Sequence, residues 1–375
     1  MNGYIFISCF LLIINALTVF GQSGTRVITL RTQRNSAPPK RFSVAQVLDE
    51  RSDKTTLGTL FDGTQTGPNP PRPVALTLTG GTGPAIERFL KADDSRRSDA
   101  RSDPTRWEIV VRLKKVQFSE KLTTPRKIDG NLTVVLVFDV LRNGTRTKLT
   151  EFEGGSRFSR SPGILDLHEA LLRQTLESAL RYLDQWLALN APVQEVLARR
   201  VRVVFQPGFS GVADKGDSVF YDSRRPLRWD DFRAPPRSGR NYGAAVFSSF
   251  GYEASAHTVG GVVEVVMSVK VYELKNQSWV WPAAKNDYAL RHEQLHFDIT
   301  QLVAERFKQK LQTEDLAPDE YDSRIQYLFL DSFREMNRLQ QQYDDETAHS
   351  INRAAQDRWD AKITADLRLI SQRNP

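Results

Sequence analysis

The most regular alternation of apolar and polar residues lies at positions 262–274, VVEVVMSVKVYEL. Every second residue from Val263 to Val271 is apolar, and Glu264 and Lys270 fall on the opposite face. Successive side chains of a β-strand point to opposite faces, so this period of two predicts a strand with one apolar face. The pattern fits either an edge strand, along which an extended peptide pairs, or a strand buried within a sheet.

Strands and one long helix are predicted in the first half of the chain. Residues 107–116 and 132–141 are rich in β-branched and apolar residues, and Asn143-Gly144 predicts a turn into a returning strand at 145–152. Residues 164–189 carry leucines at spacings of three, four and seven, which is typical of an amphipathic helix. Strands packed against a helix indicate an α+β domain. The leucines are Leu165, Leu172, Leu176, Leu180, Leu183 and Leu187.

The last third of the chain predicts helices. No Gly or Pro occurs from Tyr288 to Gln312, and Asp287 is placed to cap the start of a helix there. A second helix is predicted at 318–342, and a third ends near residue 370. The third has apolar residues four apart, which predict a face that packs into a core: Ile351, Ala355, Trp359, Ile363 and Leu367.

Length and charge indicate two domains. The chain has 375 residues and a net charge of +7; residues 1–210 are basic and the remainder is slightly acidic. We predict an α+β domain at 25–208 and a second domain at 212–375. The basic charge of the first domain indicates an ordinary solvated surface; the alternative is contact with the cell envelope or another anionic polymer. No basic run is interleaved with aromatic residues, so nucleic acid is not expected as a partner.

Residues 1–22 resemble a secretory signal peptide. Positions 5–20 are almost entirely apolar, and a small polar stretch follows, with a cleavage site expected near Gly21 or Gln22. We therefore predict a secreted or periplasmic protein; the alternative is an uncleaved membrane anchor. The single cysteine, Cys9, lies inside this segment. The mature chain would have no thiolate, so any zinc must be held by His, Asp or Glu.

The stretch His292-Glu293-Gln294-Leu295-His296 contains the candidate metal ligands and general base of the chain. It holds two of the five histidines, four residues apart on the predicted helix. Residues at this spacing lie on one helix face, so both imidazoles can bind one metal ion. A glutamate beside them is placed to act as the general base on a zinc-activated water. The alternative is two structural histidines that share a helix.

A catalytic zinc site needs a third protein ligand. A histidine six residues after His296 is absent from the sequence. Among more distant candidates, the polar stretch at 343–350 favours His349 first and Glu346 second, with His257 third. Three further residues are read as solvated: His168 on the first long helix, and Asp298 and Asp344, for which orientation of the zinc ligands is the alternative role.

Residues 227–359 resemble a bacterial family of secreted zinc-dependent proteases that was long catalogued as a domain of unknown function. Three patches carry the resemblance, in addition to Ser278-Trp279-Val280. They are LRWDDF at 227–232, HEQLHFDI at 292–299, and YDDETAH at 343–349 followed by Gln356 and Trp359. Leu295 and Ser350 stand where the family usually has glycine. The resemblance implies zinc and peptide hydrolysis.

We therefore expect a secreted zinc metallopeptidase with an α+β, zincin-like second domain, in which a small sheet accompanies the active-site helix. His292, His296 and His349 would bind Zn²⁺, and Glu293 would act as general base on a peptide or protein substrate. The rival function is a non-catalytic, envelope-associated binding protein with a structural zinc site. A closed fourth coordination position would mark that second kind of site.

Overall fold

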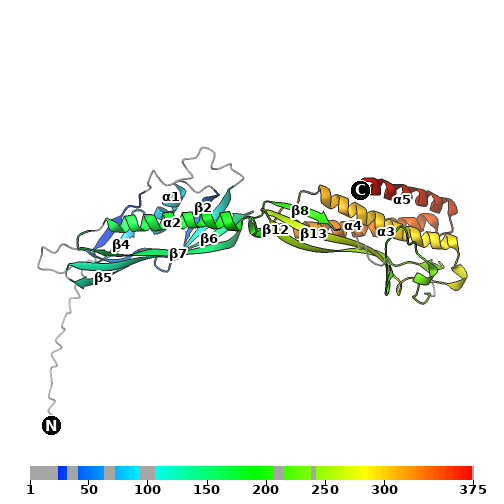
Figure 1. Cartoon of the computed structure of the whole chain (residues 1–375), viewed down its shortest axis with the longest axis horizontal. Helices are drawn as coiled ribbons and strands as arrows, with labels where there is room; N and C mark the ends of the chain where they lie inside the picture. The colour runs from blue at the N-terminus through cyan, green and yellow to red at the C-terminus, as the bar shows by residue number, and fades with distance from the viewer. Residues whose placement is uncertain are drawn as a thin grey trace, which may run out of the picture. The chain divides into compact units, whose positions relative to one another are not determined.

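The computed structural model describes residues 24–31, 41–62, 72–92, 106–124, 126–164, 166–206, 214–237 and 242–373. These residues form a mixed α/β structure with five α-helices and several sheets (Figure 1). The chain divides into two compact units, Met1–Ala188 and Leu189–Pro375. None of the described helices is long and apolar enough to span a membrane. The predicted signal peptide lies outside the described residues.

The first unit is built on a seven-stranded sheet in the order β1-β4-β3-β5-β6-β7, with β2 paired to β5. The long strands β5, β6 and β7 contain the predicted strands at 107–116, 132–141 and 145–152, and the predicted turn joins β6 to β7. Asn143 and Gly144 both have positive φ there, 48° and 78°, as a tight two-residue hairpin requires. The strands are β1 (Thr25–Ile28), β2 (Phe42–Asp49), β3 (Gly58–Asp62), β4 (Arg72–Leu78), β5 (Trp107–Thr124), β6 (Lys127–Arg142) and β7 (Thr145–Arg160).

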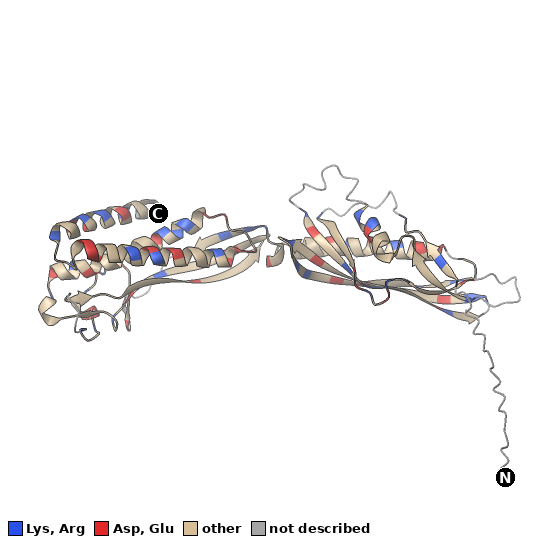
Figure 2. Cartoon of the chain, turned by 180° about the vertical axis from the view of Figure 1, so that it is seen from behind, with Lys and Arg blue, Asp and Glu red and all other residues tan. Residues whose placement is uncertain are grey.

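Two helices, α1 (Thr82–Lys91) and α2 (Leu167–Asn190), cover one face of this sheet (Figure 1). The predicted amphipathic helix at 164–189 is confirmed, because α2 buries Leu172, Leu176, Leu183 and Leu187. Figure 2 shows acidic and basic residues mixed along the helices and strands of the unit. The proposed contact of this unit with an anionic polymer stays a prediction.

The prediction that His168 lies on the surface is wrong. His168 is fully buried at the start of α2, where its Nε2 lies 2.7 Å from Glu120 Oε1. Arg160 donates two hydrogen bonds to the same carboxylate, at 2.7 and 2.6 Å, and the Phe61 amide donates a fourth at 2.9 Å. A buried carboxylate is tolerated because it is paired and fully hydrogen-bonded. This cluster ties β3, β5, β7 and α2 together.

The second unit contains a five-stranded sheet in the order β12-β13-β10-β9, in which β8 also pairs with β13. A separate pair, β11 with β14, completes its strands. The strands are β8 (Arg200–Phe205), β9 (Asp214–Lys215), β10 (Ser218–Phe220), β11 (Ala244–Ala245), β12 (Ser248–Val259), β13 (Val262–Leu274) and β14 (Trp279–Val280). Because β8 belongs to this sheet, the second unit begins before the boundary that charge and loop composition predicted near residue 210.

β13 alternates buried and half-buried residues along its whole length, which confirms the strand and its apolar face. It is not an edge strand, because it pairs with β12 on one side and with β8 and β10 on the other. Its alternation reflects a central strand with one face against the core. Of the two alternatives, the strand within a sheet is therefore confirmed, and the edge strand along which a peptide pairs is excluded.

Three helices follow the sheet: α3 (Asp287–Thr313) packs against β12 and β13, and α4 (Tyr321–Thr347) and α5 (Arg353–Arg373) pack against α3. The residue that caps α3 is Asn286, whose Oδ1 accepts the Ala289 amide at 2.9 Å, one position before the predicted Asp287. Predicted core residues Ala355, Trp359 and Ile363 of α5 are buried, but Ile351 precedes the helix and is exposed.

Candidate metal centre

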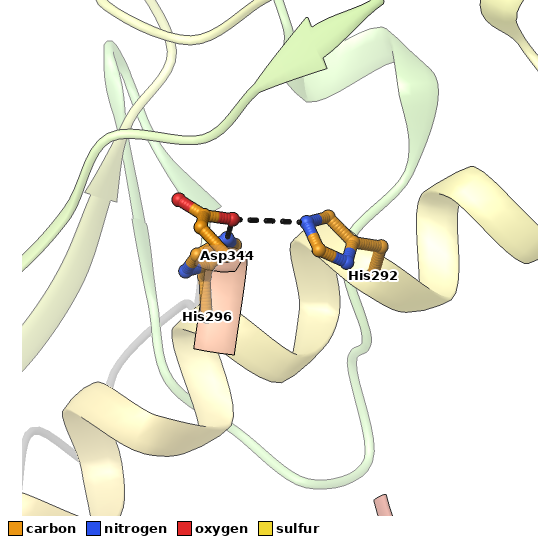
Figure 3. Close-up of side chains that lie close together, drawn as sticks. All are labelled: His292, His296 and Asp344. Carbon is orange, nitrogen blue, oxygen red and sulfur yellow. Dashed lines mark hydrogen bonds and ion pairs between the residues drawn. The ribbon is translucent and has the colours of Figure 1, made fainter. Parts of the chain in front are cut away.

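Three potential metal ligands meet where α3 packs against α4 (Figure 3). His292 and His296 come from α3, and Asp344 comes from the last turn of α4. Asp344 Oδ1 lies 3.2 Å from His292 Nε2 and 2.9 Å from His296 Nε2. One ligand atom from each residue lies within 4.8 Å of the other two.

The helices position these side chains through ordinary packing. The spacing of four residues places His292 and His296 on the buried face of α3, where they are 4% and 7% exposed. The Tyr343 ring, buried between the helices, stacks on His292 at 4.6 Å and meets the edge of His296 at 4.9 Å. Asp344 follows Tyr343 directly, so the packing of Tyr343 between the two helices places the Asp344 carboxylate beside the histidines.

Glu293 lies beside the histidines and is 4% exposed. Its Oε2 accepts the Val246 amide at 2.8 Å, from the segment between β11 and β12. Burial raises the pKa of Glu293, although the positive charge of the two histidines and the Val246 hydrogen bond act against this. A carboxylate with raised proton affinity is suited to accept and return a proton.

The hydrogen-bond partners of His292 test whether a cation fits here. The Gln356 amide donates to the Tyr288 carbonyl at 3.3 Å, so its Oε1 is the atom that faces His292 Nδ1, also at 3.3 Å. That oxygen can only accept, so Nδ1 carries a hydrogen and Nε2 is the nitrogen left to bind a cation. In the metal-free chain Nε2 hydrogen-bonds to the Asp344 carboxylate; a cation between the two atoms would take the place of that hydrogen.

The Asp344 carboxyl group favours its ionised form, which is the form that binds a cation. Burial acts to raise the pKa of Asp344, but hydrogen bonds to His292 and His296 and the charges of His296 and His349 outweigh it and hold the pKa well below its usual range. Ligand atoms about 2.0–2.1 Å from a tetrahedral zinc lie about 3.3 Å from each other. The two separations from Asp344, 3.2 and 2.9 Å, are close to this value, and all three ligand atoms lie within 4.8 Å of one another, so the set is compatible with a zinc ion.

His349, which the sequence analysis ranked first as the third zinc ligand, lies at the edge of this centre. Its Nδ1 is 3.3 Å from Asp344 Oδ1, and its ring stacks on Tyr242 at 4.6 Å. Three successive residues, Ala348, His349 and Ser350, have left-handed backbone conformations with φ of 46°, 50° and 71°. Such conformations are unusual outside glycine, and that of Ser350 explains why glycine suits this position. The role of His349 as a zinc ligand stays a prediction.

The structure does not bring Glu346 or His257 to the centre. Glu346 accepts hydrogen bonds from Gln342 and from the Trp359 indole, and so joins α4 to α5. His257 pairs with Glu264 near the far end of β12. Ser248, at the near end of β12, lies against the His296 carbonyl. Nine residues of strand separate the two positions, which places His257 roughly 30 Å away.

Asp298 is buried and bonded rather than solvated. Its Oδ1 accepts from Tyr221 at 3.0 Å and from Gln294 at 2.8 Å, and its Oδ2 accepts from Arg291 at 3.2 Å. Gln294 also accepts the Leu227 amide at 2.7 Å. These polar residues of the helix motif therefore anchor α3 to the loop at 221–228, and the described contacts of Asp298 do not include either histidine.

A cavity of about 220 Å³ opens onto the candidate centre. Small residues form much of its wall, including Gly243, Ala244 and Ala284, and Tyr242 and Val246 add to it. A larger cavity of about 1080 Å³ lies along the α3 face that carries Arg291 and Asp298, and none of the three metal-ligand candidates lines it. Of these two cavities, the smaller one is lined by Glu293 together with the three candidate ligands.

The prediction that Asp344 is solvated is also wrong, since its carboxylate lies within hydrogen-bonding distance of both histidines. The signal that identifies it is Tyr343: an aromatic residue on the buried stripe of α4 turns the next residue toward the helix interface.

Comparison with known proteins adds no functional assignment. No protein-family model matches the chain, and no curated protein matches it. Protein XCC0632 from Xanthomonas campestris, of family DUF330, is 10% identical, with a TM-score of 0.26 over 43% of this chain and 93% of that one. An uncharacterized protein of known structure is 8% identical, with a TM-score of 0.25 over 44% and 98% of the two chains. Similarity this low supports no argument about fold or function.

Proposed function

We propose that the protein is a zinc-dependent metallopeptidase. One observation carries the proposal: His292, His296 and Asp344 converge within 4.8 Å in a cavity that the buried Glu293 also lines. Three protein ligands with a nearby carboxylic acid are the requirements of a hydrolytic zinc site. The extended motif HEQLHFDI and the resemblance that it carries favour a peptide as the substrate.

Each residue has a distinct part in this proposal. The Nε2 atoms of His292 and His296 and a carboxylate oxygen of Asp344 would hold the ion. When bound, zinc supplies Lewis acidity toward a water molecule and toward the scissile carbonyl oxygen. Glu293 would accept a proton from the attacking water and return it to the leaving amine. Its hydrogen bond to Val246 holds the carboxylate in place for both transfers.

The expected location and substrate follow from the first residues of the chain. A signal peptide at 1–22 would direct the protein outside the cytoplasm, where the absence of cysteine from the mature chain makes carboxylate and imidazole the available zinc ligands. The substrate is then a peptide or protein in the periplasm or medium.

Metal content and peptide cleavage together test the proposal. We expect the purified mature chain to bind one zinc ion and to cleave an unfolded protein such as casein. Glu293→Gln should keep the zinc and lose at least about 100-fold in cleavage rate, because general-base catalysis contributes that much. Glu305→Gln is the matched control: it lies on the same helix and bonds Gln301 and Lys308 instead.

The second function is a structural zinc site. It is favoured by the position of His349, which is close enough to Asp344 to supply a fourth ligand and close the site. Zinc bound at one equivalent, a large fall in thermal stability on chelation and no cleavage of casein or cell-wall peptides would support it and overturn the peptidase proposal. Failure of the wild-type chain to bind zinc would overturn both.

A further inference from the structure

We propose that Gln356 on α5 is a positioning residue that sets the ring tautomer of His292 and thereby the zinc affinity of the centre. The inference rests on the metal-binding part of the proposed function. It assigns a role to a helix that supplies none of the three candidate ligands.

The contacts of Gln356 are few and well defined. Its side chain is 2% exposed, with the buried Ala355 before it and the buried Trp359 one turn later. Its Oε1 lies 3.3 Å from His292 Nδ1, and its Nε2 donates to the Tyr288 carbonyl at 3.3 Å. Both contacts reach from α5 to the first turns of α3, across 64 and 68 positions in the sequence.

The Tyr288 carbonyl decides which way the amide points. A carbonyl oxygen can accept a hydrogen bond but cannot donate one, so the NH₂ group of Gln356 must face it. The amide oxygen is then left facing the imidazole. If the amide were reversed, two oxygens would face each other in a buried site and both would lose a partner.

The orientation of the Gln356 amide determines which nitrogen of the His292 imidazole carries the hydrogen. Gln356 Oε1 accepts a hydrogen bond only if Nδ1 of His292 carries the hydrogen, which leaves the Nε2 lone pair directed at the metal position. Partners of this kind orient metal-binding histidines and typically contribute 10- to 100-fold to metal affinity.

The position of Gln356 depends on contacts that hold the start of α5. The Asn352 side chain accepts the Ala355 amide at 3.2 Å, and the Trp359 indole donates to Glu346 of α4 at 2.7 Å. Gln356 and Trp359 both accompany the motif at 343–349 in the sequence. Gln356 bonds α5 to α3 and Trp359 bonds it to α4, so both residues hold α5 beside the candidate centre.

Gln356→Met tests the inference, because methionine has a similar length but cannot accept the hydrogen bond. We expect its zinc affinity, measured by competition with a chelator, to fall 10- to 100-fold. Gln356→Glu should remain within about tenfold of wild type, since in its protonated form one carboxyl oxygen accepts from Nδ1 and the O–H donates to the Tyr288 carbonyl. Gln342→Met is the matched control, because Gln342 bonds Glu346 in the same corner and contacts no histidine.

Two readouts separate positioning from a loss of folding. The metal-free Met and Glu variants should melt within a few degrees of each other, and nitrogen NMR of the metal-free wild type should show the His292 hydrogen on Nδ1. Zinc affinity equal to wild type in Gln356→Met, or an Nδ1 without a hydrogen, would overturn the inference. If the wild type binds no zinc but shows the Nδ1 hydrogen, the proposed function fails while the hydrogen-bond assignment stands.

Discussion

Glu273 should make the stability of the second unit fall as the pH rises. This residue ends the core-facing row of β13 and is fully buried, and neither of its carboxylate oxygens has a hydrogen-bond partner among the described residues. Burial, with the charge of Asp231, raises the pKa of Glu273 from 4.5 to about 7, although Ser278, Lys275 and Arg225 act in the opposite direction.

The sign follows from proton binding in the two states. Between pH 4.5 and pH 7 the unfolded chain has released this proton and the folded chain retains it, so unfolding becomes easier as the pH rises through that window. The pKa difference corresponds to about 3 kcal/mol. Glutamine mimics the protonated acid, so Glu273→Gln should exceed wild type in free energy of unfolding by about 3 kcal/mol at pH 8 and by less than about 1 kcal/mol at pH 5.

Urea unfolding at pH 5 and pH 8 measures this difference, with a chelator present so that zinc does not contribute. Hydrogen exchange of peptides from β13 reports the second unit separately from the first. Glu264→Gln is the control, because Glu264 is on the opposite face of the same strand, where Arg202 pairs with it. If Glu273→Gln and wild type change in parallel between the two pH values, the carboxylate is already ionised in the fold and the reasoning is refuted.

Three further outcomes are expected. Asp344→Asn should weaken zinc binding by about 100-fold or more, since one ligand of a zinc site contributes about 3 kcal/mol; Asp345→Asn, its exposed neighbour, should not change the affinity in the same chelator competition. Zinc at 1,000 times its Kd should stabilise the second unit by about 4 kcal/mol, and calorimetry that shows no shift on chelation would contradict this. Glu120→Gln should destabilise the first unit by about 3–5 kcal/mol, because it leaves Arg160 buried without its partner; denaturation with a loss under 1 kcal/mol would show that water replaces the carboxylate.

Local patterns in the sequence were sufficient for the elements and for the two histidines of the centre. The alternation along β13, the leucine spacing of α2 and the Asn143-Gly144 turn each depend on residues within a few positions of one another. The pairing of His292 and His296 is equally local, because helix geometry alone places residues four apart on one face.

Tertiary packing decided everything that depends on distant residues. Asp344 reaches His296 across 48 positions, and Gln356 reaches His292 across 64. No period in the sequence encodes such contacts; they arise where Tyr343 packs α4 against α3 and where α5 closes over the same corner. The central position of β13 and the burial of His168 beside Glu120 have the same origin. A strand's neighbours and a polar side chain's burial depend on which elements meet, and that is settled by the packing of the whole unit rather than by any one segment.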